Sequence, residues 1–296
     1  MEIKSFLEYL QFEKNYSEHT QRAYGRDLAQ FESFMKQEHP QVELADATYA
    51  VIRHWIAHLA ATHTNRSINR KLSSLKTFYG YLERVGQRKG NPLGAHRSLK
   101  VQTDFALPLS EKEMEELLDA MRFEDSMSGR RDQLMIELLY STGMRRKELI
   151  GLRLADWDRS KRILRIRGKG NKERFLPVLP EIQEMLKAYV EEMTSEADRS
   201  PQAPLLRTDK GKPLYPTFVY RTINKYLQEV STKVKKSPHI LRHTFATHLL
   251  NRGADLNSVK ELLGHASLAS TQVYTHSSIE ELKKVHQAAH PRSEKK

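Results

Sequence analysis

The chain has 296 residues, and at roughly 100–200 residues per domain this length favours two domains over one. It contains no cysteine, which excludes cysteine proteases, cysteine phosphatases, zinc fingers built on thiolates and domains stapled by disulfides. Its 49 Lys and Arg residues outnumber its 37 Asp and Glu residues, and the net charge of +12 favours a polyanionic partner, nucleic acid first, over a basic protein without one.

Four helices are predicted within the first 85 residues, because apolar side chains recur there at helical spacing. The first helix carries an i, i+3, i+4, i+7 stripe that starts at Ile3, and the second begins after Ser17, a residue type that caps helices. The third covers residues 48–61, and the fourth starts at Asn65. Residues 1–85 should therefore form a small helical bundle.

Basic residues are concentrated just after the third helix. Residues 1–63 hold six basic and nine acidic residues, whereas residues 64–105 hold nine basic and two acidic ones. A basic helix face suits contact with phosphates, although a solvated face is an equally good interpretation of this helix taken alone. The candidate phosphate contacts are Arg66, Arg70, Lys71, Lys76, Arg84 and Arg88, together with Lys172 and Arg174 further along the chain.

A basic linker is predicted over residues 86–107. Gly86, Gly90, Asn91-Pro92 and Gly94 interrupt any helix there, since glycine and proline punctuate regular structure. The second domain then covers residues 108–296.

The second domain is predicted to be mainly helical with a small β-sheet or hairpin, an α+β arrangement. Ser110 and Glu113 have the spacing of a capping box at a helix start. Strands are expected over 162–167 and 174–178, on either side of the turn sequence Gly168-Lys169-Gly170-Asn171. The expected helices are one that ends at Thr142-Gly143 and others near 181–193, 216–230, 240–251, 257–263 and 278–289.

Several common sites lack support in this sequence. It has no Walker A loop, no G-x-G-x-x-G and no H-E-x-x-H, and its late histidines do not have the spacing of metal ligands. No run of 18 apolar residues occurs, and the amino terminus has no signal-peptide core. We therefore expect a cytoplasmic protein with no membrane partner and no metal site.

Four short segments of the second domain stand out in combination. They are STGMRRKEL at 141–149, GKGNKER at 168–174, PHILRHTFATH at 238–248, and LLGH at 262–265, which Tyr274 follows nine residues later. In order and spacing they resemble the catalytic signature of the tyrosine recombinase (phage integrase) family, most closely its bacterial Xer branch. The resemblance extends over nearly the whole chain and implies a SAM-like helical core-binding domain followed by a catalytic domain.

The resemblance also implies the catalytic residues. They are Arg145, Lys169, His239, Arg242, His265 and the nucleophile Tyr274, with Glu148 as a supporting residue. Two alternatives stay open, since Arg146 adjoins Arg145 and Lys172 follows Lys169, although we favour the first of each pair. On the helix of His239, we interpret Phe245 and His248 as packing residues and His243 as a supporting or buried histidine.

These residue types suit the transfer of a DNA phosphodiester. Two guanidiniums can hold the non-bridging phosphate oxygens with paired donors. His239 is a candidate base for the tyrosine hydroxyl, whose ordinary pKa is about 10, and Lys169 is a candidate acid for the leaving 5′-oxygen. Attack by Tyr274 would give a 3′-phosphotyrosine. Because this link conserves the phosphoester bond, rejoining requires neither ATP nor metal, and no cofactor is expected.

In function, the resemblance implies site-specific recombination of duplex DNA and, for the Xer branch, resolution of chromosome dimers. The implied partners are DNA with a specific recombination site, a homotetramer or a heterotetramer with a related recombinase, and a DNA translocase active at division. Other hypotheses are the integrase of a mobile element, a type IB topoisomerase and a sequence-specific DNA-binding regulator. In recombinases of this kind the last helix, here near 278–289, packs on a neighbouring protomer, so we expect exchange rather than packing on its own core.

Overall fold

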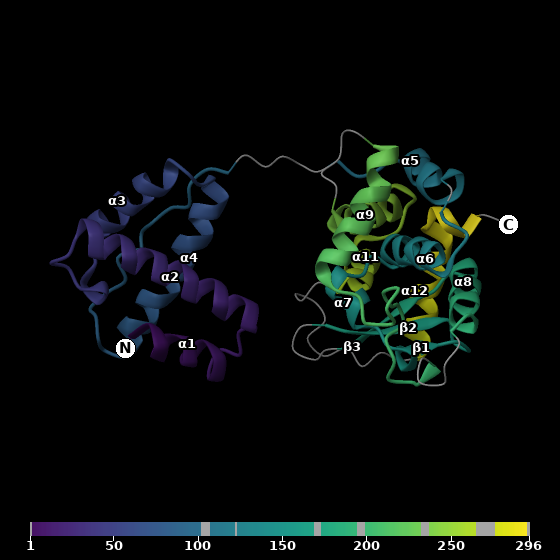
Figure 1. The fold of residues 1–296 in the computed structure, drawn as a ribbon, viewed down its shortest axis with the longest axis horizontal. Helices are drawn as coiled ribbons and strands as arrows, with labels where there is room; N and C mark the ends of the chain where they lie inside the picture. The colour runs from purple at the N-terminus through teal and green to yellow at the C-terminus, as the bar shows by residue number, and fades with distance from the viewer. Residues whose placement is uncertain are drawn as a thin grey trace. The chain divides into compact units, whose positions relative to one another are not determined.

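The structure, a computed structural model, describes residues 2–101, 107–121, 123–168, 173–193, 199–231, 237–264 and 276–294. The chain divides into two compact units, Met1–Asp104 and Phe105–Lys296, and Figure 1 shows the fold of each. None of the described helices has the length and apolar composition that crossing a membrane requires.

Within residues 2–101, the amino-terminal unit forms a bundle of four helices. They are α1 (Glu2–Phe12), α2 (Glu18–Glu38), α3 (Tyr49–Ala60) and α4 (Asn65–Arg84), with a 3-10 turn η1 (Leu44–Asp46) before α3. The hydroxyls of Ser17 and Thr64 accept hydrogen bonds from the first turns of α2 and α4, which is why these helices start there. Aromatic rings fill the core, among them Phe6, Phe31, Trp55 and Phe78.

The segment predicted as a linker packs largely on this first unit. Leu93 is buried in its core. The side chain of Asn69 on α4 accepts a hydrogen bond from the Leu99 N–H at 2.9 Å and donates one to the Leu99 carbonyl at 2.8 Å. The two units separate only after Asp104, near the end of the predicted linker.

The carboxy-terminal unit contains a small antiparallel sheet with the strand order β1-β2-β3. The strands are β1 (Trp157–Asp158), β2 (Ile163–Arg167) and β3 (Glu173–Pro177). Leu164 pairs with Leu176, and Ile166 pairs with Arg174. Because side chains alternate along a strand, these four lie on one face, which is buried. The two longer strands were predicted, whereas β1 was not, since two residues carry no periodic signal.

Helices surround this sheet and build most of the unit. They are α5 (Glu111–Glu115), a π-helical turn η2 (Glu116–Ala120), α6 (Met127–Thr142), α7 (Arg146–Gly151), a 3-10 turn η3 (Leu154–Asp156), α8 (Pro180–Glu191), α9 (Pro216–Val230), α10 (Pro238–Asn251), α11 (Leu256–Leu263), α12 (His276–Ala289) and a 3-10 turn η6 (Pro291–Glu294). The predicted capping box of Ser110 and Glu113 is present at α5.

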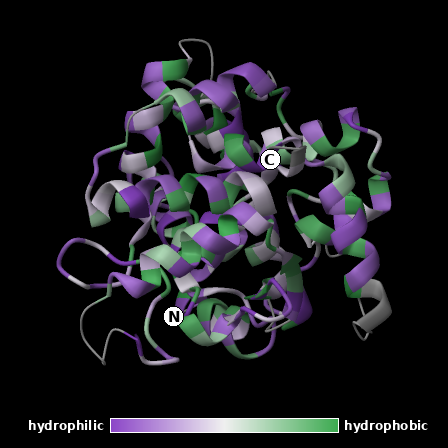
Figure 2. Cartoon of the chain, turned by 90° about the vertical axis from the view of Figure 1, so that its right-hand side faces the viewer, coloured by the Kyte–Doolittle hydropathy of each residue, from purple (hydrophilic) through white to green (hydrophobic). Residues whose placement is uncertain are grey.

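Helix α6 is the central element of this unit. It packs against α8, α9 and α10, and Figure 1 shows it between α8 and α9. Its residues from Leu134 to Thr142 are all buried. The surrounding helices mix hydrophilic and hydrophobic residues along their lengths, as Figure 2 shows, and this is the pattern of helices with one buried face. The predicted fold class, mainly α with a small sheet, is confirmed.

The last helix, α12, packs on its own unit. Leu282, His286 and Ala289 are buried, and the helix contacts β3, α10 and α11. The ring of His286 donates a hydrogen bond from Nε2 to the Ser141 carbonyl at 2.6 Å. In the single chain described, the apolar stripe and the buried histidine of α12 thus complete the core of the same unit. Exchange of this helix between protomers of an assembly stays a prediction.

Candidate functional site

The site is built around the turn after α6. Gly143 ends this helix in the left-handed conformation, with φ at +62°, which glycine adopts without strain. A Cβ atom added at Gly143 would lie 2.4 Å from Cδ1 of Phe245 on α10. The close approach of α10 thus requires glycine here, and it brings Arg242, one turn before Phe245, beside the residues that follow Gly143.

Arg145 and Glu148 form a reciprocal pair at the start of α7. The backbone N–H of Arg145 donates to Oε2 of Glu148 at 2.6 Å, and Nη1 of Arg145 donates to Oε1 at 3.0 Å. Glu148 is the third residue of the helix, where a carboxylate satisfies an N–H left unpaired at the helix start. This carboxylate fixes both the backbone and the guanidinium of Arg145.

Arg242 on α10 is held between the ends of two helices. Its Nη1 donates to the Gly143 carbonyl at 2.5 Å and its Nη2 to the Leu263 carbonyl at 2.7 Å. Carbonyls at helix carboxyl ends carry partial negative charge and attract cations. Burial first, and then the charge of Arg145, lowers the pKa of Arg242 to about 10, so the group remains charged at neutral pH. The two carbonyl bonds use two of its five N–H donors.

Arg174 lies in this site rather than on a DNA-facing surface. Its side chain is 8% exposed, and Nη1 and Nη2 donate to Oε1 and Oε2 of Glu148 at 2.8 and 2.9 Å. Its prediction as a phosphate contact is thus corrected, because strand alternation places it on the buried face of β3. The usable signal in the sequence was its position two residues before Leu176, on the same face of the strand.

His239 lies in the first turn of α10, directly after Pro238. Its ring is exposed, but partial withdrawal from water, and then the cations of Arg146, Arg242 and Arg145, lower its pKa below the ordinary value. His239 is therefore neutral at neutral pH and can accept a proton. Arg146 donates from Nη1 to the Pro216 carbonyl at 3.4 Å, whereas Arg145 is the one of the two that shares Glu148 with Arg174.

The remaining predicted catalytic residues, Lys169, His265 and Tyr274, lie outside the described residues, as does the alternative Lys172. Among the accompanying residues of α10, Phe245 and His248 are buried, as predicted. His243 is exposed, which contradicts the buried interpretation of this histidine, and its supporting role stays a prediction.

On α4, the predicted phosphate contacts divide into exposed and internal side chains. Arg66, Arg70, Lys76 and Arg84 are exposed. Lys71 is buried, and its ammonium donates to Asp27 at 3.3 Å and to Gln30 at 2.5 Å. We therefore correct Lys71 to a core residue, since it neutralises a carboxylate that is itself 2% exposed.

Two of the exposed arginines and Arg88 also have contacts within the first unit. Arg70 forms a bidentate pair with Asp27. Arg84 donates to the Tyr9 hydroxyl at 3.1 Å. Arg88 bonds to the carbonyls of Ala45 and Gly90. The side chains of Arg66 and Lys76 thus remain the simplest candidates for contact with a phosphate backbone.

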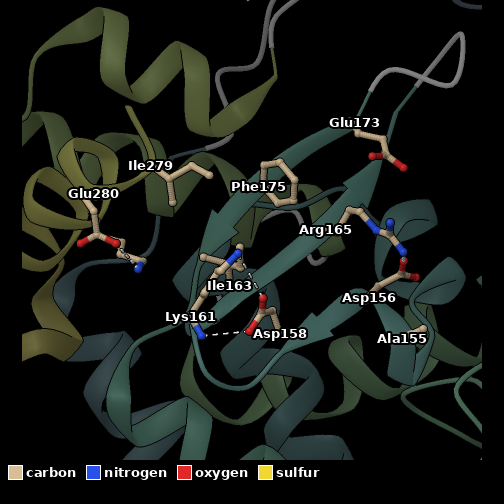
Figure 3. A pocket seen from close by; sticks show the side chains of 11 residues that line it. Ala155, Asp156, Asp158, Lys161, Ile163, Arg165, Glu173, Phe175, Ile279 and Glu280 are labelled. Atoms are coloured by element: carbon tan, nitrogen blue, oxygen red, sulfur yellow. Dashed lines mark hydrogen bonds and ion pairs between the residues drawn. The ribbon is translucent and has the colours of Figure 1, made fainter. Parts of the chain in front are cut away.

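A separate pocket lies between the sheet and α12. It is lined by Ile163, Arg165 and Phe175 on the strands and by Ile279, Glu280 and Lys283 on α12, among others. Figure 3 shows the strand side chains together with Ile279 and Glu280. Arg165 and Phe175 lie on the face of the sheet opposite to Arg174. The pocket is therefore distinct from the guanidinium cluster.

The cluster as a whole is suited to hold an anion. Arg145, Arg174 and Arg242 come from three separate segments of the chain and face a single carboxylate, that of Glu148. This leaves an excess of positive charge at one point, with planar donors that match the oxygens of a phosphate. The neutral His239 lies at its edge.

Comparison with known families matches both units. The model of the Phage integrase family matches residues 108–281, and the model of the phage integrase N-terminal SAM-like domain matches residues 3–86. Among curated proteins, tyrosine recombinase XerC of Anoxybacillus flavithermus is 40% identical over 98% of both chains. Tyrosine recombinase XerC of Myxococcus xanthus is 39% identical over the same shares.

Solved structures show the same fold at lower identity. The integrase of the Tn1549 transposon, in complex with circular intermediate DNA, has a TM-score of 0.70 at 19% identity, over 95% of this chain and 98% of that one. The site-specific recombinase XerH, bound to a palindromic difH substrate after cleavage, has a TM-score of 0.70 at 20% identity, over 92% and 80%.

Proposed function

Because the chain belongs to the phage integrase family, we propose that its guanidinium cluster holds the phosphate of a DNA strand while Tyr274 attacks it. The chain is a tyrosine site-specific recombinase. The observation that carries the assignment of roles is the convergence of Arg145 and Arg242 on the turn at Gly143. Both side chains are oriented by fixed partners, as electrostatic catalysis requires.

In the proposed reaction, Arg145 and Arg242 bind the non-bridging oxygens, where negative charge accumulates in the transition state. A bond forms between the Tyr274 oxygen and phosphorus, and the bond from phosphorus to the 5′-oxygen breaks. His239, neutral because of its surroundings, accepts the tyrosine proton. Lys169 gives a proton to the leaving 5′-oxygen, and His265 donates a hydrogen bond to the phosphate. Rejoining is the reverse attack by a 5′-hydroxyl.

For substrate and role, we propose duplex DNA with a specific site and the resolution of chromosome dimers. Support comes from the XerC relatives, which match over 98% of the chain, and we therefore favour this role over integration of a mobile element. The related XerH is bound to its DNA substrate. We further propose that four protomers, identical or of two kinds, assemble on two DNA sites.

A covalent adduct tests the reaction. Wild-type protein is incubated with nicked duplexes that carry candidate sites, so that the cleaved end diffuses away, and the mixture is denatured in SDS. We expect a protein–DNA adduct from wild type and none from Tyr274→Phe. Tyr220→Phe is the matched control, because Tyr220 is an exposed tyrosine of the same unit, 43% accessible.

Two results would contradict the proposal. An adduct from Tyr274→Phe equal to that of wild type would show that another residue is the nucleophile. Relaxation of plasmid DNA that lacks any candidate site, at the rate seen with one, would instead favour topoisomerase activity.

A further inference from the structure

Arg174 is the buried cation that lies behind the proposed phosphate-binding residues. It occupies the second position of β3 and points to the core face of the sheet with Leu176. An arginine is rarely this buried unless it is paired, and burying the charge alone would be costly. Its three nitrogen atoms must therefore have partners, and the identity of these partners indicates the role of the residue.

All three nitrogen atoms of Arg174 are engaged within the cluster. Two donate in parallel to the two carboxylate oxygens of Glu148, at 2.8 and 2.9 Å, and Nε donates to the Leu262 carbonyl at 3.2 Å. A bidentate pair of this kind fixes the plane of the carboxylate as well as its position. Arg174 thus ties β3 to α7 and to the end of α11.

Glu148 passes this orientation on to Arg145. Each of its oxygens accepts one bond from Arg174 and one from Arg145, so that Oε1 holds the Arg145 guanidinium and Oε2 holds the Arg145 backbone. The carboxylate is 6% exposed, whereas Arg145 is 42% exposed. The order from inside to outside is therefore Arg174, Glu148 and Arg145, and only Arg145 reaches toward a substrate.

The end of α11 closes the cluster on a third side. Gly264 has a φ of +64°, and a Cβ atom added there would lie 3.0 Å from Cδ and Nη1 of Arg174. The Gly264 carbonyl accepts a longer bond, 3.4 Å, from Nη2 of Arg145. The residue that follows Gly264 is His265, so Arg174 packs directly beneath the backbone that leads to it.

We propose that Arg174 is a positioning residue for strand cleavage, which acts through Glu148 to hold the Arg145 guanidinium in the geometry that receives the phosphate. This inference rests on the proposed function. Without Arg174, the buried carboxylate would have Arg145 as its close cationic partner, and the stronger pairing would draw Arg145 inward, away from a phosphate. A group 1 Å out of place can cost about a hundredfold in rate.

The protonation of Glu148 supplies a readout that a packing role would not alter. Burial acts to raise the pKa of Glu148, but hydrogen bonds and charge from Arg174, and then Arg145, lower it below the ordinary value. The charged groups that face it are Arg145, just before α7, Arg174 on β3 and Arg242 on α10. Without Arg174, less remains to counter the effect of burial, and the pKa of Glu148 rises. The carboxylate of the variant therefore takes up a proton at a higher pH than that of wild type.

The experiment measures the rate of adduct formation at saturating DNA, from pH 5 to 8, together with DNA affinity and thermal stability. The variants are Arg174→Met, Arg174→Lys, Glu148→Gln and the double variant Arg174→Met/Glu148→Gln. The double variant leaves no unpaired buried charge and guards against loss of folding. Arg131→Met is the matched control, because Arg131 is equally buried and carboxylate-paired near the opposite end of α6.

We expect Arg174→Met to lower the cleavage rate by as much as about a hundredfold with little change in DNA affinity. Its loss of activity in acid should begin at a higher pH than in wild type. Arg174→Lys should resemble it, since lysine cannot form the bidentate pair. The double variant should be no slower than the slower single variant. Because it has no carboxylate at position 148, its loss of activity in acid should not begin at the higher pH expected for Arg174→Met. Arg131→Met should lower the thermal stability but leave the pH dependence of the cleavage rate as in wild type.

A folded Arg174→Met protein with the wild-type rate and pH profile would overturn the inference and leave the proposed function intact. Additive losses in the double variant would also overturn it, because Arg174 would then act independently of Glu148. Absence of any Tyr274-dependent adduct from wild type would overturn the proposed function and this inference with it.

Discussion

At the scale of single residues, the site sets the protonation of His239 through its neighbours. The cations of Arg146, Arg242 and Arg145 add to partial burial in lowering the pKa of this ring. A histidine that must accept a proton benefits from such surroundings, because its neutral form persists to lower pH. The role of Arg146 is therefore to lower the pKa of His239, whereas Arg145 is the residue that pairs with Glu148.

We predict that the rate of adduct formation rises with pH through the pKa of His239 and is level by neutral pH, because the pKa lies below its ordinary value. Arg146→Gln removes a cation, so the pKa rises and the acid limb moves to higher pH. His239→Gln should lower the rate about 10²-fold or more and abolish the limb. The measurement is single-turnover adduct formation from pH 5 to 8.

Lys147→Gln is the control for charge, because Lys147 is an exposed neighbour in the same turn and is not one of the cations that lower the pKa of His239. The assignment of this role to Arg146 would be refuted by either of two results. In one, Arg146→Gln leaves the pH at which the rate falls in acid unchanged. In the other, Lys147→Gln shifts that pH equally far.

At the scale of elements, the sequence was informative wherever a local rule decides the structure. Ser17 and the Ser110–Glu113 box mark helix starts by side-chain hydrogen bonds that the structure contains. The short elements β1 and α7 were missed because two and six residues carry no usable periodicity. Arg174 and Lys71 were misplaced since their partners, Glu148 and Asp27, are 26 and 44 positions away.

The docking of α12 is another feature that only the three-dimensional structure discloses. His286 is 1% exposed and donates to the Ser141 carbonyl, and burial lowers its pKa to about 4. The neighbouring His290 has its pKa lowered by burial and by His286. Nearby, burial raises the pKa of Glu137 to about 7 despite its pair with Arg292.

We predict that docking makes the carboxy-terminal unit less stable in acid. The folded pKa of His286 lies below the unfolded value of 6.5, so the unfolded chain binds the proton more readily, and the contribution of His286 is full above pH 6.5 and is lost as pH falls toward 4. A difference of this size corresponds to about 3 kcal/mol. The raised pKa of Glu137 changes stability with pH in the opposite direction. The variant and wild type, which both contain Glu137, are therefore compared at each pH.

His286→Gln keeps an N–H donor for the Ser141 carbonyl but does not titrate in this range. The free energy of unfolding of wild type should exceed that of His286→Gln at pH 7. Because wild type loses the contribution of His286 in acid, this difference should become smaller by about 3 kcal/mol between pH 7 and pH 4. Urea unfolding is followed by Trp157 fluorescence in a Trp55→Phe background, because the two tryptophans lie in different units. His243→Gln, an exposed change on α10, should show no such trend. Parallel curves for His286→Gln and wild type would count against the prediction.

At the scale of the whole molecule, the net charge of +12 indicated the class of partner but not the residues that meet it. Arg174 and Lys71 are buried in ion pairs, and Arg70 is shared with Asp27. Charge counted along a sequence cannot separate such internal cations from exposed ones, because the pairing carboxylates come from other segments. The cations available for DNA are thus fewer than the composition implies.

The salt dependence of DNA binding should separate these two kinds of cation. Arg66 and Lys76 are exposed on α4. If each neutralises one phosphate, Arg66→Gln/Lys76→Gln should lower the slope of log Kobs against log salt by about 0.9 per contact, and should weaken binding to specific and unrelated duplexes alike. Lys71→Gln removes the same charge from a buried pair. It should therefore leave the slope unchanged and lower the melting temperature of the first unit.

Fluorescence anisotropy with a labelled duplex between 50 and 200 mM salt would measure the slopes, and thermal unfolding would measure the cost of Lys71→Gln. The comparison is sharp because the three substitutions lie on one helix and each removes one unit of charge. Equal slopes for wild type and the double variant, or a slope reduced by Lys71→Gln, would show that exposure on α4 does not determine which cations meet the phosphates.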